Sequence, residues 1–268
     1  MTVKKGKIQG LSHSDAAEKF NWPKSGVPRS CEITVNYACN AKCLFCYNPM
    51  YAEELQSKEV PFKRVAEILY ANVKKGYWVA YLIGGEPTVR EDLPKIAALA
   101  RKIGFPCVQV MTNGINLADK GYARLLVESG ANLFRVSIHG PDEKIHDRMV
   151  DVPGAFKKTI KAIRNLKRLG VQVGVNFVIT ALNYKSFPRF MKMMLCDYDV
   201  RHFCIVHGHY RGVMEVNREL LKIPMTDTAP YIRDGLEIFK AHNIQIVERM
   251  LSNFTPCVLP GYEHLMAE

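Results

Sequence analysis

The sequence lacks any long hydrophobic run. Its longest apolar stretches, such as residues 173–182, have the length of a β-strand, whereas a helix that crosses a bilayer needs about 20 apolar residues. The charged residues at the N-terminus are not followed by an apolar segment, which excludes a secretory signal peptide there. The sequence therefore predicts no interaction with a membrane.

Internal repeats, low-complexity segments and a disulfide framework are missing as well. Three of the eight cysteines fall in one short motif, which indicates a reducing environment and favours the cytoplasm. The 268 residues are 48% hydrophobic and 24% charged, as in ordinary soluble proteins. A chain of this length can form one large α/β domain with a proper core.

Negative charge is in short supply, and the formal net charge is +11. Part of the excess lies before residue 30, and part lies in one helix expected at residues 155–169. The basic residues of this helix are Lys157, Lys158, Lys161, Arg164, Lys167 and Arg168. They can form the solvated outer face of an amphipathic helix, or a surface for an acidic partner such as RNA or an acidic peptide.

Three cysteines lie unusually close together. Cys39, Cys43 and Cys46 form a C-x3-C-x2-C motif, so three thiolates can lie on one loop around one inorganic centre. Cubane iron–sulfur clusters normally have four cysteine ligands, and three ligands leave one iron open for chemistry. A structural zinc site would need a fourth nearby ligand, yet residues 47–61 contain neither Cys nor His. The spacing favours an open cluster, with zinc as the alternative.

This motif, with Phe45 directly before its last cysteine, resembles the signature of the radical S-adenosylmethionine (radical SAM) enzymes. The resemblance implies a [4Fe–4S] cluster, held by the three cysteines, whose open iron is chelated by S-adenosyl-L-methionine (SAM). It implies that the reduced cluster cleaves SAM to methionine and a 5′-deoxyadenosyl radical, which abstracts a hydrogen atom from substrate. It also implies an external electron donor of the flavodoxin or ferredoxin type.

Apolar, β-branched segments alternate with amphipathic ones, which indicates parallel βα units. We expect strands at residues 32–35, 78–83, 107–111, 133–138, 171–179 and 201–206. We expect helices at residues 62–75, 93–103, 120–129, 155–169 and 184–195, with Pro188 in the first turn of the last one. Six such units predict an α/β fold, a partial (β/α)6 TIM-type barrel, and the resemblance implies the same fold.

The expected barrel divides the chain into three parts. Residues 1–30 form a basic N-terminal lead-in with a possible helix at 15–20, and residues 31–208 form the radical SAM core. Residues 209–268 form a C-terminal extension with a helix at 228–242 and a strand at 244–247. Because terminal additions and loops vary on a shared scaffold, we expect this extension to cap the substrate.

Gly84, Gly85 and Glu86 directly follow the second expected strand. Glycines let the backbone approach a ligand closely, and a carboxylate can accept hydrogen bonds from an ammonium group. A tight turn with a helix-capping acid is the structural alternative. The motif resembles the GGE motif of the family, which implies that it binds the amino group of SAM. Thr112 and Asn113, at the end of the third strand, are typical of a turn.

Polar residues also follow later strands. Ser137 and His139 alternate at the end of the fourth strand, and Asn176 lies in an apolar strand where an unpaired amide would cost free energy. The resemblance implies that these three side chains contact SAM. It also implies that Val178, on the same side as Asn176, and Phe45 lie near the adenine. Ordinary core or turn roles remain the alternative for Ser137 and His139.

Cys257 lies between prolines near the C-terminus. It can be a buried small hydrophobe, a hydrogen-atom donor in the active site, or a ligand to an auxiliary cluster. The last possibility would need partners among Cys107, Cys196 and Cys204, whose spacing contains no C-x2-C pair.

The sequence as a whole predicts a radical SAM enzyme, an oxidoreductase or bond-forming catalyst, that acts on a peptide or protein. A tRNA or a small metabolite is the alternative substrate. A non-catalytic zinc protein that binds RNA through its basic surfaces is the alternative of another class.

Overall fold

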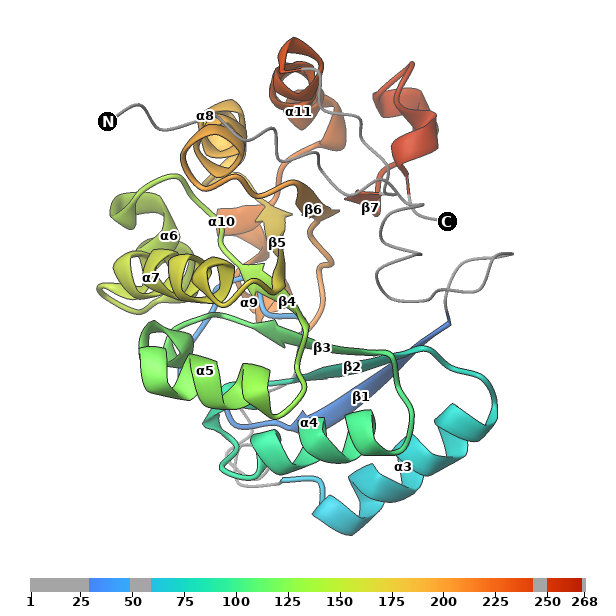
Figure 1. Cartoon of the computed structure of the whole chain (residues 1–268). Coiled ribbons are helices and arrows are strands. Elements are labelled where there is room, and N and C mark those ends of the chain that lie inside the picture. The colour runs from blue at the N-terminus through green and yellow to red at the C-terminus, as the bar shows by residue number, and fades with distance from the viewer. Residues whose placement is uncertain (1–28, 49–58, 243–249, 267–268) are drawn as a thin grey trace, which may run out of the picture.

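The computed structural model describes residues 29–48, 59–242 and 250–266. Seven parallel strands form one sheet in sequential order, and the sheet curls into a half-barrel (Figure 1). The strands are β1 (Ser30–Asn36), β2 (Val79–Gly84), β3 (Cys107–Thr112), β4 (Leu133–Ser137), β5 (Gln172–Ile179), β6 (His202–His207) and β7 (Leu251–Ser252). The α/β partial barrel predicted from the sequence is confirmed.

Helices connect the strands, and most of them cover the outer face of the sheet (Figure 1). They are α3 (Phe62–Lys74), α4 (Leu93–Lys102), α5 (Lys120–Glu128), α6 (Glu143–Val150), α7 (Ala155–Arg168), α8 (Phe187–Lys192), α9 (Val213–Val216), α10 (Arg218–Leu221) and α11 (Met225–Ala241). None of the helices within the described residues is long and apolar enough to cross a membrane.

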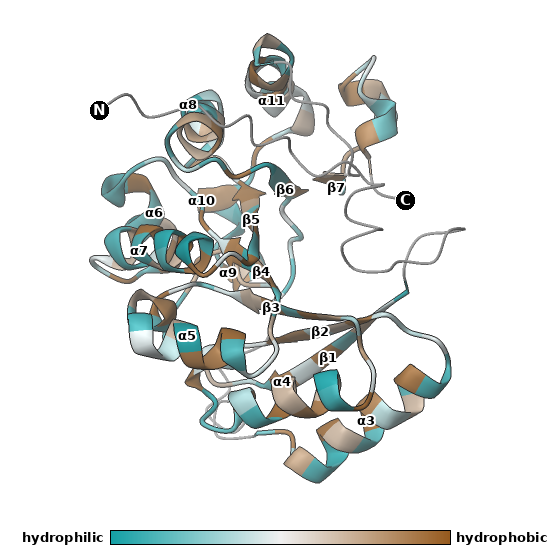
Figure 2. Ribbon diagram, in the orientation of Figure 1, coloured by the Kyte–Doolittle hydropathy of each residue, from teal (hydrophilic) through white to brown (hydrophobic). Residues whose placement is uncertain are grey.

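The strands form because their alternating residues match the two faces of the sheet. In β5, Val173, Val175 and Phe177 are buried, whereas Asn176 and Val178 on the other face are only half-buried. Figure 2 shows the brown apolar residues concentrated on the strands and on the helix sides that face them. The main core therefore lies between the sheet and its helices, and the more polar inner face remains for a site.

Most expected elements lie within a few residues of the observed ones. The short helices α6, α9 and α10 were not expected, and one further helix and one strand also differ. The helix expected at 184–195 is a 3₁₀ turn, then α8 with Pro188 in its first turn, then a π-helical turn at Met193–Asp197. Strand β7 pairs with β6 and was not expected. The helix expected at 15–20 and the strand expected at 244–247 lie outside the described residues.

The C-terminal extension shares the core of the barrel. Helix α11 packs against α8, and β7 extends the sheet. Leu251, Leu259 and Leu265 are each at most 1% exposed and belong to the same apolar cluster as the strand residues. The extension is thus part of the folded barrel, which brings its residues close to the loops at the carboxyl ends of the strands.

Candidate functional site

The cysteine loop follows β1 at the carboxyl end of the sheet, where active residues of barrel enzymes gather. Helix α6 holds one side of this loop. The N–H groups of Lys42 and Leu44 each donate a hydrogen bond of 3.0 Å, to the carbonyls of Val150 and Met149. The last carbonyls of a helix lack partners within that helix. These bonds therefore give partners both to the last carbonyls of α6 and to the N–H groups of the cysteine loop. They fix the backbone on both sides of Cys43.

The C-terminal extension holds the other side of the loop. The Met214 N–H donates to the Cys46 carbonyl at 3.1 Å, and the Asn217 amide donates to the Leu44 carbonyl at 2.9 Å. Gly212 has a φ of +60°, and a Cβ there would lie 2.5 Å from the Tyr47 carbonyl oxygen. The segment expected to cap the substrate therefore also supports the cysteine loop.

Replacement of Asn217 with alanine is expected to loosen the loop, because the Leu44 carbonyl loses its side-chain donor. The free energy of unfolding should fall by about 1 kcal/mol, and less iron should be retained per chain after reconstitution. Thermal unfolding and iron analysis measure the two effects. Glu219→Gln is the matched control, because this side chain is 79% exposed and lies two residues further along, in α10. Equal iron retention in both variants would contradict this role.

The three thiols of the motif are close enough to influence one another. Burial raises the pKa of Cys39 to about 12, with a further contribution from Glu86. Burial raises the pKa of Cys43 well above its usual range, and the neighbouring Cys39 and Cys46 raise it further. Three thiolates therefore need strong positive charge at this place, which bound iron supplies. The residues present fit an iron–sulfur cluster.

Within the described residues, no group of three or more His, Cys, Asp or Glu side chains is arranged around the position of a single metal ion. In a cubane cluster each cysteine binds a different iron, so the thiols need not converge on one point.

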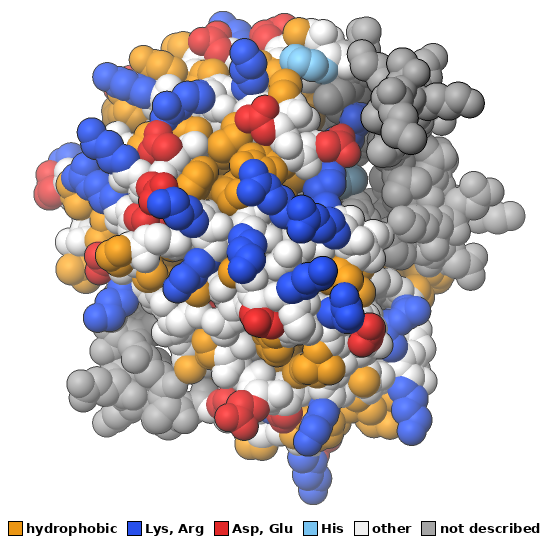
Figure 3. Space-filling view, turned by 60° about the vertical axis from the view of Figure 1, so that its left-hand side comes forward, with side chains coloured by type: hydrophobic (Ala, Val, Ile, Leu, Met, Phe, Trp, Pro, Cys, Tyr) orange, Lys and Arg blue, Asp and Glu red, His pale blue; other side chains and the backbone are white. Residues whose placement is uncertain are grey.

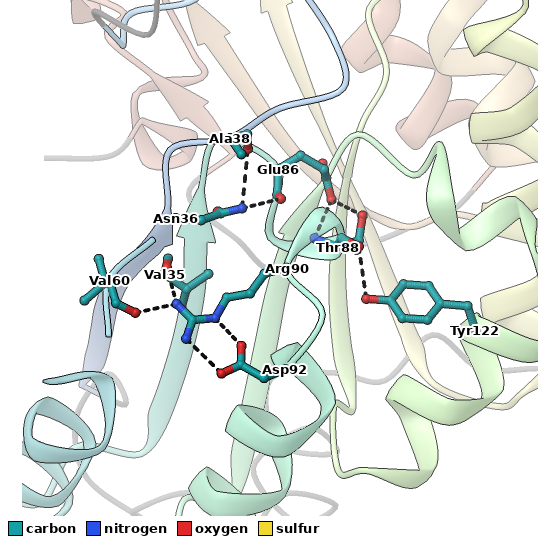
Figure 4. A network of polar contacts seen from close by, with 9 residues as sticks. All are labelled: Val35, Asn36, Ala38, Val60, Glu86, Thr88, Arg90, Asp92 and Tyr122. Carbon is teal, nitrogen blue, oxygen red and sulfur yellow. Dashed lines mark hydrogen bonds and ion pairs between the residues drawn. The ribbon is translucent and has the colours of Figure 1, made fainter. Parts of the chain in front are cut away.

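Glu86 lies two residues beyond the end of β2 and is 1% exposed. Its carboxylate accepts four hydrogen bonds. Oε1 accepts from the Thr88 N–H at 3.1 Å, the Thr88 hydroxyl at 2.6 Å and the Thr112 hydroxyl at 2.7 Å. Oε2 accepts from the Asn113 N–H at 2.6 Å. Figure 4 shows the Thr88 contacts. Glu86 thus caps the short helix after β2, and Oε2 keeps capacity for another donor.

Glu86 is a buried carboxylate that forms no ion pair with any of the described residues. Burial raises its pKa, although the hydrogen bonds from Thr88, Asn113 and Thr112 oppose this shift. No lysine or arginine among the described residues forms an ion pair with it. A buried carboxylate is stabilised most by an opposite charge, so the arrangement suits a ligand with an ammonium group.

Gly84 and Gly85 are required by close packing of the backbone. A Cβ at Gly84 would lie 2.4 Å from the Asn36 carbonyl oxygen, and one at Gly85 would lie 2.3 Å from that of Ala38. The Glu86 N–H donates to the Ala38 carbonyl at 2.8 Å. The glycines therefore bring the turn that carries Glu86 against the start of the cysteine loop, one residue before Cys39.

Arg90 is a structural residue of the site that the sequence analysis missed. It is 2% exposed and donates bonds of 2.6 Å to the carbonyls of Val35 and Val60 (Figure 4). Its guanidinium also pairs with Asp92. This arginine ties the turn after β2 to the end of β1, and no sequence motif distinguishes it from a surface arginine.

Asparagines connect the cysteine loop to the end of β3. The Asn113 amide donates to the Asn40 side-chain oxygen at 2.7 Å, and the Asn40 amide donates to that of Asn116 at 3.1 Å. Asn113 therefore contacts Glu86 through its backbone and the cysteine loop through its side chain. The sequence indicated only a turn here, because such bonds depend on the tertiary arrangement.

His139 lies just beyond β4, which ends at Ser137, and it is 1% exposed. Its ring makes an edge contact with Phe45 at 4.4 Å between centroids. Its Nδ1 accepts from the Val178 N–H at 3.1 Å. His139 therefore links the cysteine loop to β5 and is more deeply buried than the half-buried Ser137.

Ser137 and Asn176 are register partners on β4 and β5, and Val178 follows on the same face as Asn176. All three side chains are half-buried. The structure thus brings these three predicted residues together on the inner face, near Phe45 and His139.

Cys257 does not join this group of residues through any contact within the described residues. It is exposed on a 3₁₀ turn, η5 (Pro256–Val258), with its Sγ 3.6 Å from the Thr255 hydroxyl. The expectation of a buried small hydrophobe is therefore wrong, because the Cys257 side chain lies at the surface.

A second buried histidine makes stability depend on pH. His146 is 1% exposed, and its Nδ1 accepts from the His139 N–H at 3.1 Å. Burial lowers the pKa of His146 to about 4, whereas an unfolded histidine titrates near 6.5. Between these values the unfolded chain binds more protons, so stability should fall by about 3 kcal/mol as the pH falls from about 6.5 to about 4.

The variant His146→Asn should reduce this pH dependence, because an asparagine oxygen can accept from the His139 N–H without titrating. Denaturant unfolding at several pH values measures the slope. The same substitution at the exposed His264 serves as the control. A slope that stays unchanged in His146→Asn would show that another group causes the acid sensitivity.

A parallel half-barrel with three clustered thiols and a buried carboxylate at the carboxyl ends of its strands defines a cofactor-dependent barrel enzyme. The model of the Radical SAM superfamily matches residues 33–194, and the chain belongs to this superfamily. It is therefore a radical SAM enzyme, a member of a superfamily that uses a [4Fe–4S] cluster and SAM. This membership excludes the non-catalytic zinc protein as the class of the chain.

The names of the sequence relatives refer to different substrates. The chain is 32% identical over 184 residues to Fe-coproporphyrin III synthase of Methanosarcina barkeri, covering 68% of this chain and 45% of that protein. It is 29% identical over 160 residues to a probable GTP 3′,8-cyclase of Sulfolobus acidocaldarius, covering 59% and 50%. The chain thus spans about half the length of the curated relatives it matches.

A solved structure with a similar fold is Streptococcus suis SuiB bound to its precursor peptide SuiA. The TM-score is 0.70 at 18% identity, and the match covers 94% of this chain and 54% of that chain. A second is anSMEcpe with bound AdoMet and a peptide, with a TM-score of 0.61 at 18% identity, covering 82% and 63%. Both similarities confirm the fold.

Proposed function

We propose that Cys39, Cys43 and Cys46 hold the [4Fe–4S] cluster and that Glu86 binds the ammonium group of SAM. One observation carries the proposal. The Glu86 carboxylate is buried, forms no ion pair with the described residues, and belongs to a turn that contacts the start of the cysteine loop. When bound, the cluster and SAM supply the electron transfer and the radical that abstracts hydrogen from substrate. The chain's own residues orient SAM and exclude water.

The proposed SAM pocket continues across the inner face. Ser137 and Asn176 offer polar groups from adjacent strands, and His139 holds Phe45 and the Val178 backbone together. We assign the ribose and carboxylate of SAM to Ser137, His139 and Asn176, and the adenine to the neighbourhood of Phe45 and Val178. Half-burial on a shared face supports this assignment for Ser137, Asn176 and Val178, and the ring contact between His139 and Phe45 supports it for those two residues.

A peptide or protein is the proposed substrate. The similarity to the peptide-bound SuiB structure covers 94% of the chain and so reaches into the C-terminal extension, which is proposed as the substrate cap. The sequence relatives named for tetrapyrrole and GTP chemistry match only 68% and 59% of the chain. Those names nevertheless make a small metabolite the second candidate.

The inner wall of the barrel offers polar groups to such a substrate. The Tyr81 hydroxyl is buried and has no hydrogen-bond partner among the described residues. Burial raises the pKa of Tyr81. The nearby Arg135 opposes this shift, whereas Cys204 and Glu32 add to it. Because a buried hydroxyl without a partner costs free energy, a polar substrate group would stabilise it.

The role of Cys257 as a hydrogen-atom donor stays a prediction.

The remaining proposals concern the electron donor and the cellular compartment. A flavodoxin or ferredoxin is proposed as the electron donor, and the cytoplasm as the compartment. All eight cysteines are free thiols, which supports a reducing environment.

The substrate proposal is tested by SAM cleavage in the reconstituted enzyme under anaerobic conditions with dithionite. A degenerate peptide pool should increase 5′-deoxyadenosine formation above the level seen without substrate, and mass spectrometry should show a modified peptide. Stimulation by GTP alone, with no modified peptide, would replace the peptide by the small metabolite.

A further inference from the structure

The cysteine loop reaches the molecular surface beside a basic region. Lys42, inside the C-x3-C-x2-C motif, is exposed, while its backbone is bonded to the end of α6. The Asp147 carboxylate of α6 accepts from the N–H groups of Gly154 and Phe156, at 2.6 and 2.7 Å, and so fixes the start of α7. The first turns of α7 are thereby held beside the cysteine loop.

The exposed side chains of this region are mainly basic. Helix α7 contains six basic residues and no acidic one. We call the region that adjoins the loop the α6–α7 basic face, and it consists of Lys42, Lys144, Arg148, Lys157, Lys158 and Lys161. Figure 3, which brings the left-hand side of Figure 1 forward, shows lysine and arginine side chains spread over this side of the molecule.

The described residues neutralise little of this positive charge. Lys157 pairs with Glu143 at 3.1 Å, and Asp151 is the other exposed acid beside the face. Lys158 and Lys161 have no ion pair among the described residues. An uncompensated charge of one sign attracts a partner of the opposite sign and speeds its association.

We propose that the α6–α7 basic face is the docking surface for an acidic one-electron carrier protein, which reduces the cluster. The inference rests on the proposed cluster on Cys39, Cys43 and Cys46. The carrier is oxidised by one electron and the cluster gains that electron, so no other reactant is needed. The contact between α6 and the cysteine loop favours this partner over RNA, because a carrier must approach the cluster whereas RNA need not.

The double variant Lys158→Glu/Lys161→Glu tests the proposal, since both side chains are exposed and form no ion pair with the described residues. The probe is a flavodoxin reduced to its hydroquinone. Stopped-flow absorbance measures the rate of cluster reduction, and fluorescence titration measures the affinity for oxidised flavodoxin. At low ionic strength both should fall about tenfold, and their salt dependence should become weaker.

The matched control is Lys63→Glu/Lys95→Glu, which changes the charge equally on the exposed sides of α3 and α4. Dithionite should reduce the cluster equally in all three proteins, which separates docking from the presence of the cluster. Equal effects of both double variants on flavodoxin would overturn the proposal. An unchanged response to flavodoxin, with lost binding of a single-stranded RNA oligonucleotide, would assign the surface to RNA instead.

Discussion

Replacement of Cys43 with alanine is expected to abolish the cluster and all SAM cleavage. The Cys43 thiol lies between the other two thiols of the motif and responds to both of them. The loop around it is fixed by backbone bonds from Lys42 and Leu44, so no neighbouring residue can move in as a ligand. The broad iron–sulfur absorption near about 400 nm should disappear.

Absorbance and iron analysis of the reconstituted variant make this measurement, with Cys196→Ala as a control. Cys196 is an exposed free thiol, in contact with His242 and outside the motif, so its loss should leave the absorption intact. If Cys43→Ala kept the absorption and Cys196→Ala lost it, the assignment of the cluster to Cys39, Cys43 and Cys46 would be wrong.

The variant Glu86→Gln is expected to bind SAM about 10- to 100-fold more weakly, because a charge-assisted hydrogen bond in a buried site contributes about 1.5–3 kcal/mol. A glutamine amide would also direct N–H groups toward the donors of Thr88 or Asn113. Some loss of stability should accompany the loss of affinity. Equilibrium binding of SAM to the reconstituted enzyme measures the main effect.

Glu91→Gln removes the same charge at an exposed position five residues further along the chain. It should leave the affinity for SAM and the iron content unchanged. If Glu86→Gln lost iron but retained SAM affinity in the remaining holoenzyme, Glu86 would stabilise the cysteine loop and would not bind SAM.

The fold could be predicted because its signals are local. Six strands and the main helices follow from alternating and amphipathic patterns that each extend over several residues. Strand β7 was not predicted, because its two residues, Leu251–Ser252, are too few to show a pattern. They pair with β6 only through the tertiary arrangement. Helix α6 was also missed, although Asp142 before Glu143 is an N-terminal helix signal, and the Asp142 side chain does accept from the Ile145 N–H.

The candidate site could be predicted only where a motif marks it. The cysteine spacing and the Gly84-Gly85-Glu86 run identify the residues proposed to touch the cofactors. The residues that support them carry no such mark. Asn217 reaches Leu44 across 173 positions, and Arg90 reaches Val35 across 55. These contacts exist only after folding, so a single sequence does not reveal them.

The most direct test of the account is electron paramagnetic resonance of the reconstituted, dithionite-reduced protein before and after addition of SAM. We expect the signal of one [4Fe–4S] cluster, which changes when SAM binds to its open iron and is accompanied by 5′-deoxyadenosine. A reduced cluster whose signal does not respond to saturating SAM would contradict the account.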